Sequence, residues 1–260
     1  MTDPDHRGPP DGKARLDAEL VRRGLVRSRA QARQLVTCGA VLVDGATATK
    51  PSTPVSAANA IVLAEEPDRW VGRAAYKLLE ALRLFGEDGL TVVGKRCLDV
   101  GASTGGFTQV LLERGCREVI AVDVGTDQLA AQLRDDPRVR SLQQTNLRDL
   151  TLAHLDDKPV DLAVADVSFI SLTLLVGPLL GVTAADGELL LLVKPQFEVG
   201  RERLGSGGVV RDEGLRRQGV DGVVASAGLH GWSSAAVVPS RIQGASGNTE
   251  LFVLLRRRER

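Results

Sequence analysis

The chain has 260 residues, which is enough for one large α/β domain and a smaller second domain. Its formal net charge of zero excludes a protein that is basic over its whole surface, and its three cysteines lack the spacing of a disulfide framework or a metal site. The longest apolar segment, residues 167–182, is interrupted by polar residues and is shorter than the roughly 20 apolar residues that span a bilayer. We therefore expect a cytoplasmic protein with no membrane-spanning segment and no bound metal.

Residues 1–13 are polar and rich in Pro, Gly and Asp, which predicts a disordered tail and not a signal peptide. The stretch that follows is locally basic, with eight Lys or Arg residues against three Asp or Glu between Lys13 and Lys50. A polyanion is the partner that such an excess favours. The alternative explanation is an ordinary solvated helix face.

Residues 14–63 have the pattern of a compact α+β module. Leu16, Leu20 and Val21 form the apolar stripe of a first helix, and Ser28 is suited to cap a second one. The run VLVDGATAT then predicts two short strands joined by an Asp-Gly turn.

The segment 64–72 lacks periodicity and predicts an interdomain linker, in which Trp70 has either a buried structural role or a base-stacking role. The large domain, residues 73–260, opens with a predicted helix at residues 73–85 that carries Lys77. Taken alone, Lys77 would be an ordinary surface lysine.

Strands and helices alternate through the large domain, which predicts a parallel sheet with crossover helices. The apolar strands end near Val100, Val122, Leu142, Val164 and Val193. A helix at residues 213–227 and an antiparallel pair of strands at the sheet edge end the domain, and such a terminal hairpin is a feature of the seven-stranded methyltransferase sheet. Ligands of such sheets bind at the carboxyl ends of the strands. The polar and glycine residues that fall at those ends are Gly101, Asp123, Asp166 and Lys194.

The stretch LDVGASTGGF, residues 98–107, predicts a strand, a tight turn and the start of a helix. Its glycines let the backbone approach a ligand closely, and the helix N-terminus offers unpaired N–H groups. Asp123 ends the next strand, where a carboxylate can accept hydrogen bonds from ribose hydroxyls. This arrangement indicates a nucleotide-like cofactor.

The glycine pattern disfavours a dinucleotide, because Ser103 stands where the dinucleotide fingerprint has its second glycine. Asp99 ahead of the turn, the wide glycine spacing and the terminal hairpin favour S-adenosylmethionine, which has no pyrophosphate to hold. Asn146, after the third strand, is placed to meet the adenine edge, with a structural turn as the alternative. The candidate cofactor-binding residues are Asp99, Gly101, Ala102, Ser103, Gly105, Gly106, Phe107, Asp123, Val124, Asn146, Leu147 and Asp166.

Lys77, Asp166, Lys194 and Glu250 are predicted to surround one crevice, although each has a solvated-surface explanation when taken singly. In the contexts RAAYKL, VADVSF, LLVKPQFE and GNTELF they resemble the Lys-Asp-Lys-Glu tetrad of FtsJ-type ribose 2′-O-methyltransferases. The resemblance implies that these four residues are catalytic. A sulfonium already makes its methyl group electrophilic, so the protein must mainly align a ribose hydroxyl and remove its proton. Lys194 is the candidate base, oriented by the carboxylates, while Lys77 and Glu250 hold the ribose and the lysine ammonium.

The order RLD, SRAQARQLV and GAVLVDG in the front module resembles the ribosomal-protein-S-four-like RNA-binding domain. The resemblance implies a fold whose first strand follows its second helix. It also implies that the module binds the RNA backbone, and arginine forks suit this because they grip phosphates and read little sequence. The candidate phosphate contacts are Arg15, Ser28, Arg29, Gln31, Arg33, Gln34 and Lys50.

From about Ala14 to Arg256 the chain resembles the haemolysin-A (TlyA) family of ribosomal RNA 2′-O-methyltransferases, through RLD, SRAQAR, LDVGASTGGFT, ADVSFISL and VKPQFE. The resemblance implies an α/β fold: a seven-stranded class I, Rossmann-like methyltransferase sheet that uses S-adenosylmethionine, behind a small α+β RNA-binding domain. It implies methylation of a cytidine-type ribose in 16S ribosomal RNA, 23S ribosomal RNA or both. The implied partner is ribosomal RNA within ribosomal subunits, and the oligomeric state stays open.

Three other functions are alternatives. The family's older name implies a membrane-lysing protein, and the missing membrane span counts against that function. A non-catalytic RNA-binding factor of ribosome assembly is disfavoured by the intact tetrad. A nicotinamide-dependent oxidoreductase is disfavoured by Ser103 and by the terminal hairpin.

Overall fold

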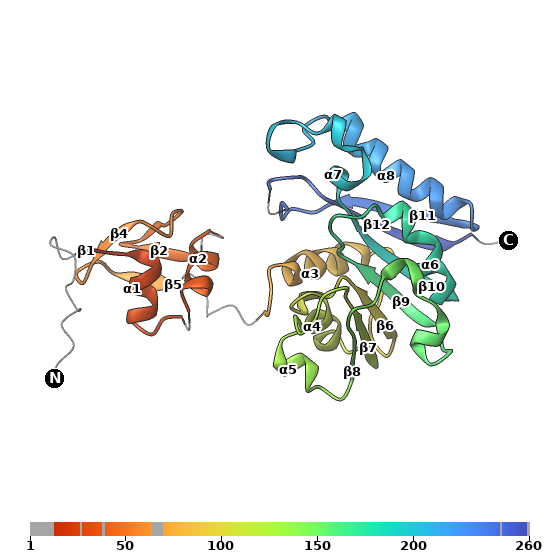
Figure 1. Ribbon diagram of the computed structural model, residues 1–260, viewed down its shortest axis with the longest axis horizontal. Helices are drawn as coiled ribbons and strands as arrows, with labels where there is room; N and C mark the ends of the chain where they lie inside the picture. The colour runs from red at the N-terminus through yellow and green to blue at the C-terminus, as the bar shows by residue number, and fades with distance from the viewer. Residues whose placement is uncertain (1–12, 27, 38–39, 64–69, 245, 259–260) are drawn as a thin grey trace. The chain divides into compact units, whose positions relative to one another are not determined.

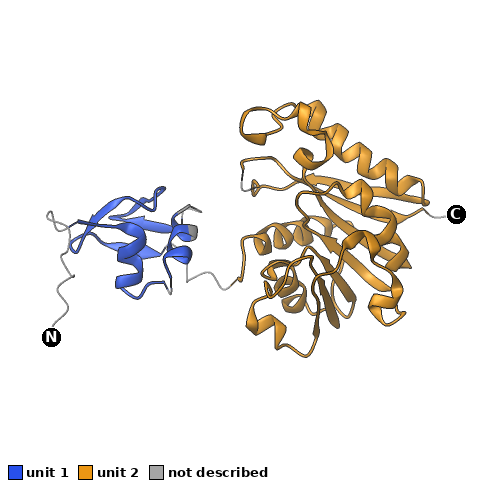
Figure 2. Ribbon diagram, in the orientation of Figure 1, with its two compact units in different colours: residues 1–69 blue, residues 70–260 orange. Residues whose placement is uncertain are grey.

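A computed structural model of the chain describes residues 13–26, 28–37, 40–63, 70–244 and 246–258. It divides the chain into two compact units, residues 1–69 and residues 70–260 (Figure 2). The break between the units lies inside the segment that we predict to be a linker. Residues 1–12 of the predicted tail and Cys38 lie outside the described residues.

Unit 1 is a small α+β module (Figure 1). Its described elements are β1 (Lys13–Arg15), α1 (Leu16–Arg22), α2 (Arg29–Thr37), β2 (Val41–Val43), β3 (Ala46–Thr47), β4 (Pro54–Ser56) and β5 (Ile61–Leu63). β1 pairs with β4, and β2 lies between β3 and β5. Its core contains Leu16 and Leu20 of α1, Leu35 of α2, and Val41 and Ile61 of the second sheet.

The strand β1 corrects the expectation that the first strand of this unit follows its second helix. Lys13, which we predict to end the tail, pairs in β1 with Ser56 of β4, so the chain is already extended before it enters α1. The backbone N–H of Leu16 then donates to the carbonyl oxygen of Thr53 at 2.8 Å. This hydrogen bond holds the start of α1 against the residue that leads into β4, far along the sequence.

Unit 2 is an α/β domain whose architecture confirms the predicted fold class. Its helices are α3 (Ala74–Phe85), α4 (Gly106–Glu113), α5 (Ala131–Arg134), α6 (Val176–Val182), α7 (Pro195–Glu198) and α8 (Glu213–Gly228). Its 3₁₀ turns are η1 (Leu147–Asp149), η2 (Leu152–Leu155), η3 (Leu172–Leu174), η4 (Arg201–Arg203) and η5 (Ser206–Gly208). Its strands are β6 (Arg96–Val100), β7 (Glu118–Val122), β8 (Val139–Leu142), β9 (Val160–Ala165), β10 (Thr183–Val193), β11 (Trp232–Pro239) and β12 (Leu251–Arg257).

The seven strands form one sheet in the order β11-β12-β10-β9-β6-β7-β8. The pairs from β10 to β8 are parallel, and β12 is antiparallel to both β10 and β11. The two antiparallel strands at the edge therefore match the predicted terminal hairpin. Since β6, β7, β9 and β10 run in one direction, their carboxyl ends meet at one side of the sheet.

Helices cover both faces of this sheet (Figure 1). Val223 of α8 and Val253 of β12 belong to the core on one face, and Leu78 of α3 and Phe252 of β12 belong to the core on the other. Neighbouring residues of β12 thus point into different layers, as the alternation of a strand requires. The central strands are apolar on both faces because both faces are buried.

Trp70 belongs to unit 2 and is buried, so the structure supports the structural role among our two alternatives. Only 8% of its surface is exposed, and its ring meets that of Tyr76 edge to face, with the centroids 6.5 Å apart. The next residue, Val71, donates its backbone N–H to Oε1 of Gln109 on α4 at 2.8 Å. The end of the predicted linker is therefore attached to the large unit.

Replacing Phe252 with Ala should destabilise unit 2 strongly. Phe252 is 1% exposed and stacks against Phe107 of α4 at 6.4 Å, so truncation leaves a cavity in the core that should cost about 3–5 kcal/mol. The matched control is Phe169→Ala, where the ring is 92% exposed and the expected change is below about 0.5 kcal/mol. Urea unfolding followed by circular dichroism measures both, and equal losses would contradict this description of the core.

Candidate active site

The turn between β6 and α4 brings the backbone close to the end of β9. Gly101 has φ 81°, and a Cβ there would lie 2.7 Å from the backbone oxygen of Asp166. Gly105 at the helix N-cap has φ 98°, a conformation that L side chains rarely adopt. Glycine is therefore required at both positions, and the turn is held against Asp166.

Asp123 ties this turn to the end of β7. Its Oδ2 accepts from the backbone N–H of Ser103 at 2.8 Å, and its Oδ1 accepts from that of Gly125 at 2.8 Å. A carboxylate oxygen has a second lone pair, so each oxygen can still accept a ligand hydroxyl. The structure thus gives Asp123 a fixed orientation at the position where we expect a ribose.

A cavity of about 280 Å³ lies beside the turn and joins it to Asp166 and Lys194. Its lining includes seven of the predicted cofactor residues, namely Asp99, Gly101, Ala102, Ser103, Gly106, Phe107 and Asp166. It also includes residues that we did not predict, namely Gly72, Arg73, Ala74, Thr104 and Ser168. The other predicted cofactor residues, Gly105, Asp123, Val124, Asn146 and Leu147, are not part of this lining.

Asp99 places a buried acceptor without a partner at this cavity. Its side chain is completely buried, and its Oδ2 accepts from Oγ1 of Thr108 at 2.6 Å. Its Oδ1 has no hydrogen-bond partner among the described residues. Burial raises the pKa of Asp99 to about 7. Because a buried acceptor without a partner is costly, this oxygen suits a cationic or N–H-bearing ligand group.

Asn146 uses its side chain within its own turn. Its Oδ1 accepts from the backbone N–H of Arg148 at 3.2 Å, and its Nδ2 donates to Asp149 Oδ2 at 2.9 Å. These contacts cap the 3₁₀ turn η1 and support the structural-turn alternative. Of the other predicted cofactor residues, Leu147 is buried in the core and Val124 is 65% exposed.

The four predicted catalytic residues come together as two ion pairs. Nζ of Lys194 lies 2.6 Å from Oδ1 of Asp166, and Nζ of Lys77 lies 2.6 Å from Oε2 of Glu250. The register of β10 and β12 pairs Val193 with Leu251, so Lys194 and Glu250, the next residues outward, lie across from each other. Lys77 reaches Glu250 from α3.

The tetrad is largely withdrawn from water. Lys77 is 9% exposed, Lys194 is 8% exposed and Glu250 is 2% exposed. Each buried charge has an opposite charge beside it, which is the condition under which such burial is tolerated. Paired and buried, these groups can hold a polar substrate in a fixed position.

Ser168 and Glu198 were not predicted, although both lie in motifs that carry the resemblance. Nζ of Lys194 donates to Oγ of Ser168 at 2.9 Å. Glu198 on α7 accepts from Oγ of Ser171 at 2.5 Å and from the backbone N–H of Leu172 at 2.8 Å. Burial raises the pKa of Glu198. Glu198 therefore joins the segment after β10 to the one after β9 and so supports the contacts of Lys194.

Phe169 is a third residue with a notable position that sequence reasoning missed. Its ring is 92% exposed although it lies 5.4 Å from that of Phe197, and its φ of 65° is unusual for a bulky side chain. It directly follows Ser168, whose hydroxyl accepts a hydrogen bond from Lys194. The signal that could have found it is an aromatic residue directly after Ser168 in ADVSFISL.

In unit 1, three of the predicted RNA contacts meet at one buried carboxylate. Asp17 is fully buried and accepts from Arg15 at 3.0 Å, Arg29 at 3.2 Å and Arg33 at 3.3 Å. The hydrogen bond from Arg15, followed by those from Arg29 and Arg33, lowers the pKa of Asp17 to about 2. The three arginine side chains remain 51–59% exposed.

The other predicted RNA contacts are more dispersed. Oγ of Ser28 accepts from the backbone N–H of Gln31 at 3.2 Å at the start of α2, which is the capping role that we predict. Lys50 is exposed in the turn before β4, and the side chain of Gln34 lies outside the described residues.

The described residues contain neither a metal-binding cluster nor a membrane-spanning helix. No group of three or more His, Cys, Asp or Glu side chains there is arranged to hold a metal ion. No helix there is long and apolar enough to cross a bilayer.

Comparisons with known proteins agree with this geometry. Residues 70–257 match the FtsJ-like methyltransferase family, and residues 14–62 match the S4 domain. The chain is 51% identical over 245 residues to the 16S/23S rRNA (cytidine-2′-O)-methyltransferase TlyA of Mycobacterium tuberculosis, covering 94% of this chain and 90% of that one. It is 36% identical over 237 residues to Hemolysin A of Brachyspira hyodysenteriae, covering 91% and 97%.

A solved structure extends the match to three dimensions. A protein of Streptococcus thermophilus that is provisionally named a hemolysin superposes with a TM-score of 0.74 at 38% identity, over 95% of this chain and 90% of that one. The predicted methyltransferase class and the predicted family resemblance are both confirmed. The chain belongs to the FtsJ-like methyltransferase family and carries an S4 domain ahead of its methyltransferase domain.

Proposed function

We propose that this protein transfers a methyl group from S-adenosylmethionine to the 2′-hydroxyl of a cytidine ribose in ribosomal RNA. The observation that carries the proposal is the pair of buried ion pairs, Lys194 with Asp166 and Lys77 with Glu250, where Lys194 and Asp166 also line the glycine-turn cavity. The name of the Mycobacterium tuberculosis relative supports the choice of nucleotide and of RNA. Such a substrate implies work in the cytoplasm, on ribosomal subunits or their RNA.

The cavity residues fit the proposed cofactor. When bound, S-adenosylmethionine supplies a methyl group that its sulfonium makes electrophilic. The partnerless Oδ1 of Asp99 suits the ammonium of the methionine part, and the turn at Gly101 lines the same cavity. Asp123, held by two backbone N–H groups, suits the ribose hydroxyls.

The tetrad divides the work on the acceptor. Asp166 and Ser168 hold Nζ of Lys194 at the wall of the cavity. Once the Lys194 ammonium has released one proton to solvent, its neutral amine receives the proton of the attacking 2′-hydroxyl. Lys77 and Glu250 supply a donor and an acceptor that hold the ribose. Fixing both oxygen and base in this way replaces a random encounter with an aligned one.

The remaining features suit an RNA acceptor. The exposed ring of Phe169, one residue from Ser168, offers a face on which a base can stack. The arginines around Asp17 in unit 1 offer exposed guanidinium groups to phosphates. The S4 domain thus binds the RNA and the methyltransferase domain modifies it.

Replacing Lys194 with Ala should lower the rate of methyl transfer by about 10²–10⁴-fold, the range for loss of a general base. Affinity for S-adenosylhomocysteine, which needs no base, should change less than about twofold. Transfer of tritiated methyl groups to ribosomal subunits and calorimetric titration measure the two quantities. Lys158→Ala, at an exposed lysine, is the control, and undiminished turnover of the Lys194 variant would falsify its role.

Replacing Asp99 with Asn should flatten the pH dependence of stability without cofactor. The pKa of Asp99 is raised to about 7 in the folded chain from the ordinary 3.8, so the folded state binds the extra proton between those values. The stability that the folded chain gains from binding this proton at Asp99 is therefore full below pH 3.8, and it is lost as the pH rises toward 7. Urea unfolding measures the free energy of unfolding at pH 5 and at pH 8. This free energy should decrease less between the two pH values for the variant than for the wild type.

The same substitution should remove a pH dependence of ligand binding. Between pH 6 and pH 8 the wild type gains a carboxylate at Asp99, so its affinity for the ammonium of S-adenosylhomocysteine should rise. The Asn variant should bind S-adenosylhomocysteine more weakly, with the same affinity at every pH in this range. Calorimetry across this range checks it. Parallel pH profiles for the two proteins would contradict the placement of Asp99 at the ligand.

Replacing Arg29 and Arg33 together with Gln should weaken RNA binding and reduce its salt dependence. If each arginine neutralises one phosphate, the slope of log K against log salt should decrease by about 1.4–1.8. Fluorescence anisotropy with a labelled ribosomal RNA fragment measures it. The charge-matched control replaces the exposed Arg83 and Arg114 of unit 2, and an equal change in both double variants would show that net charge alone matters.

A further inference from the structure

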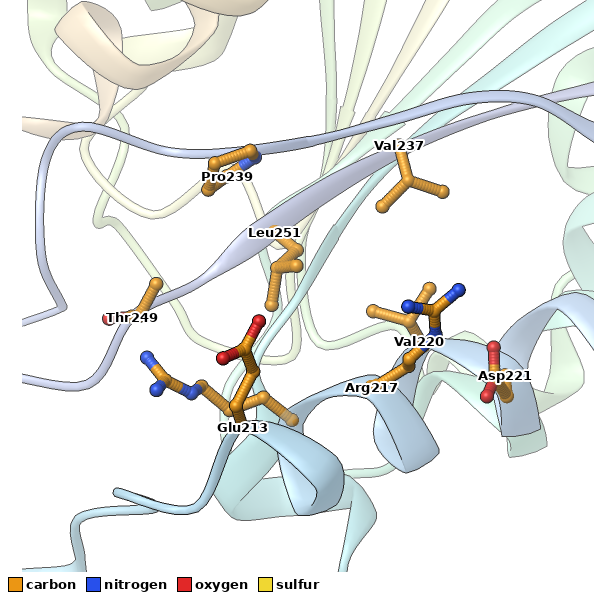
Figure 3. A pocket seen from close by; sticks show the side chains of 9 residues that line it. Glu213, Arg217, Val220, Asp221, Val237, Pro239, Thr249 and Leu251 are labelled. Carbon is orange, nitrogen blue, oxygen red and sulfur yellow. The ribbon is translucent and has the colours of Figure 1, made fainter.

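A second and larger cavity lies on the opposite side of β12 from α3, between α8 and the edge strands. Its volume is about 630 Å³, within the range of ligand pockets. Figure 3 shows Val237, Pro239 and Leu251 on the strand side and Glu213 and Arg217 on the helix side. None of its lining residues has a part in the function proposed above.

The helix side of this pocket carries charges that are not paired with one another. Glu213, Arg217 and Asp221 follow one another at four-residue spacing, which favours ion pairs on a helix, yet no ion pair joins them in the described structure. Arg216 also lines the pocket, and its Nε is buried without a hydrogen-bond partner among the described atoms. Its Nη2 donates to the carbonyl of Arg211 at 3.1 Å, which fixes the guanidinium.

The strand side is apolar and open. Val237 of β11 is 42% exposed, which is high for a valine facing a helix. Pro239 and Leu251 complete an uncharged surface on this side, and Val220 of α8 adds an apolar side chain from the helix side. A flat apolar wall opposite two guanidinium groups matches a ligand that has a planar apolar ring and a phosphate.

The start of β12 connects this pocket to the candidate active site. Thr249 and Leu251 line the pocket, and Glu250 between them pairs with Lys77 on the other face. Adjacent residues of an extended chain point to opposite faces, so the two sites share one short stretch of backbone. An RNA strand whose ribose lies against Glu250 needs to cross only this stretch to reach the pocket.

We propose that the pocket binds a nucleotide that neighbours the methylated one in the RNA strand, an inference that rests on the proposed function. Arg216 and Arg217 bind its phosphate, and the base lies against Val237 and Leu251. Glu213 and Asp221 accept from amino groups on the base edge, which favours a base with an exocyclic amine. The two carboxylates also make the pocket a poor site for a bare anion.

The direct test titrates the full chain, with methyl-labelled Val and Leu, with AMP, CMP, GMP and UMP at millimolar concentration. Saturating S-adenosylhomocysteine fills the cofactor site. We expect shifts of the Val220, Val237 and Leu251 methyl signals, with weaker binding of UMP, of ribose 5-phosphate and of adenosine. Arg217→Glu, at an exposed position, should weaken binding by about fivefold or more. Arg257→Ala, at the far end of β12, should leave it unchanged.

The second readout is methyl transfer to ribosomal RNA. Arg217→Glu should raise the apparent KM for RNA by about fivefold and leave kcat within about twofold. Unshifted methyl signals, or equal binding by the Arg217 and Arg257 variants, overturn the proposal. Nucleotide binding that survives while transfer to intact subunits alone is impaired assigns the pocket to a protein partner, and this too overturns it. Nucleotide binding in a chain that methylates no RNA refutes the proposed function, and the pocket is then a nucleotide site without a methylated neighbour.

Discussion

The antiparallel pairing of β12 with β10 is the constraint on which the candidate active site depends. It places Glu250 across from Lys194, although the two residues are 56 positions apart in the printed numbering. The parallel pairing of β10 with β9 then brings Asp166 to the same side, and α3 adds Lys77 from above the sheet face that holds Phe252. A shift of β12 by one residue would exchange Glu250 for Leu251 at this point, since side chains alternate.

The tetrad is stable in the interior because its charges cancel in pairs. Lys194 with Asp166 and Lys77 with Glu250 each form a contact of 2.6 Å. Removal of one partner leaves the other buried without compensation, which costs more than the pair contributes. Such a site can therefore be held rigid before its substrate arrives. Ser168 adds a hydroxyl that accepts from Lys194, and Glu198 adds a carboxylate that accepts from the backbone of Leu172.

Sequence patterns predict most of the fold and a good part of the site. Strand ends such as Val100, Val122 and Val193 follow from apolar runs, and the order of the elements then implies a common edge for Asp166 and Lys194. The tetrad itself was found through a resemblance, because long-range pairs such as Lys77 with Glu250 leave no periodic signal in the chain.

Contacts that form only in the folded chain explain most of what was missed. The strand β1 forms only because Lys13 meets Ser56, a partner 43 positions away in the numbering. Glu198 looks like any helix carboxylate until its partners Ser171 and Leu172 are placed beside it. Asn146 is ambiguous in sequence because the amide that could meet a base can equally cap its own turn, as it does here.

The buried Asp17 has a consequence for the kind of RNA that unit 1 can hold. Three long, flexible side chains converge on one carboxylate, so much of their conformational freedom is already lost before any RNA is bound. A cationic surface fixed in this way rewards phosphates whose spacing is also fixed, as in a folded RNA, over the shifting phosphates of an unstructured strand. Under the proposed function, selection by shape would then begin at a carboxylate that is itself buried.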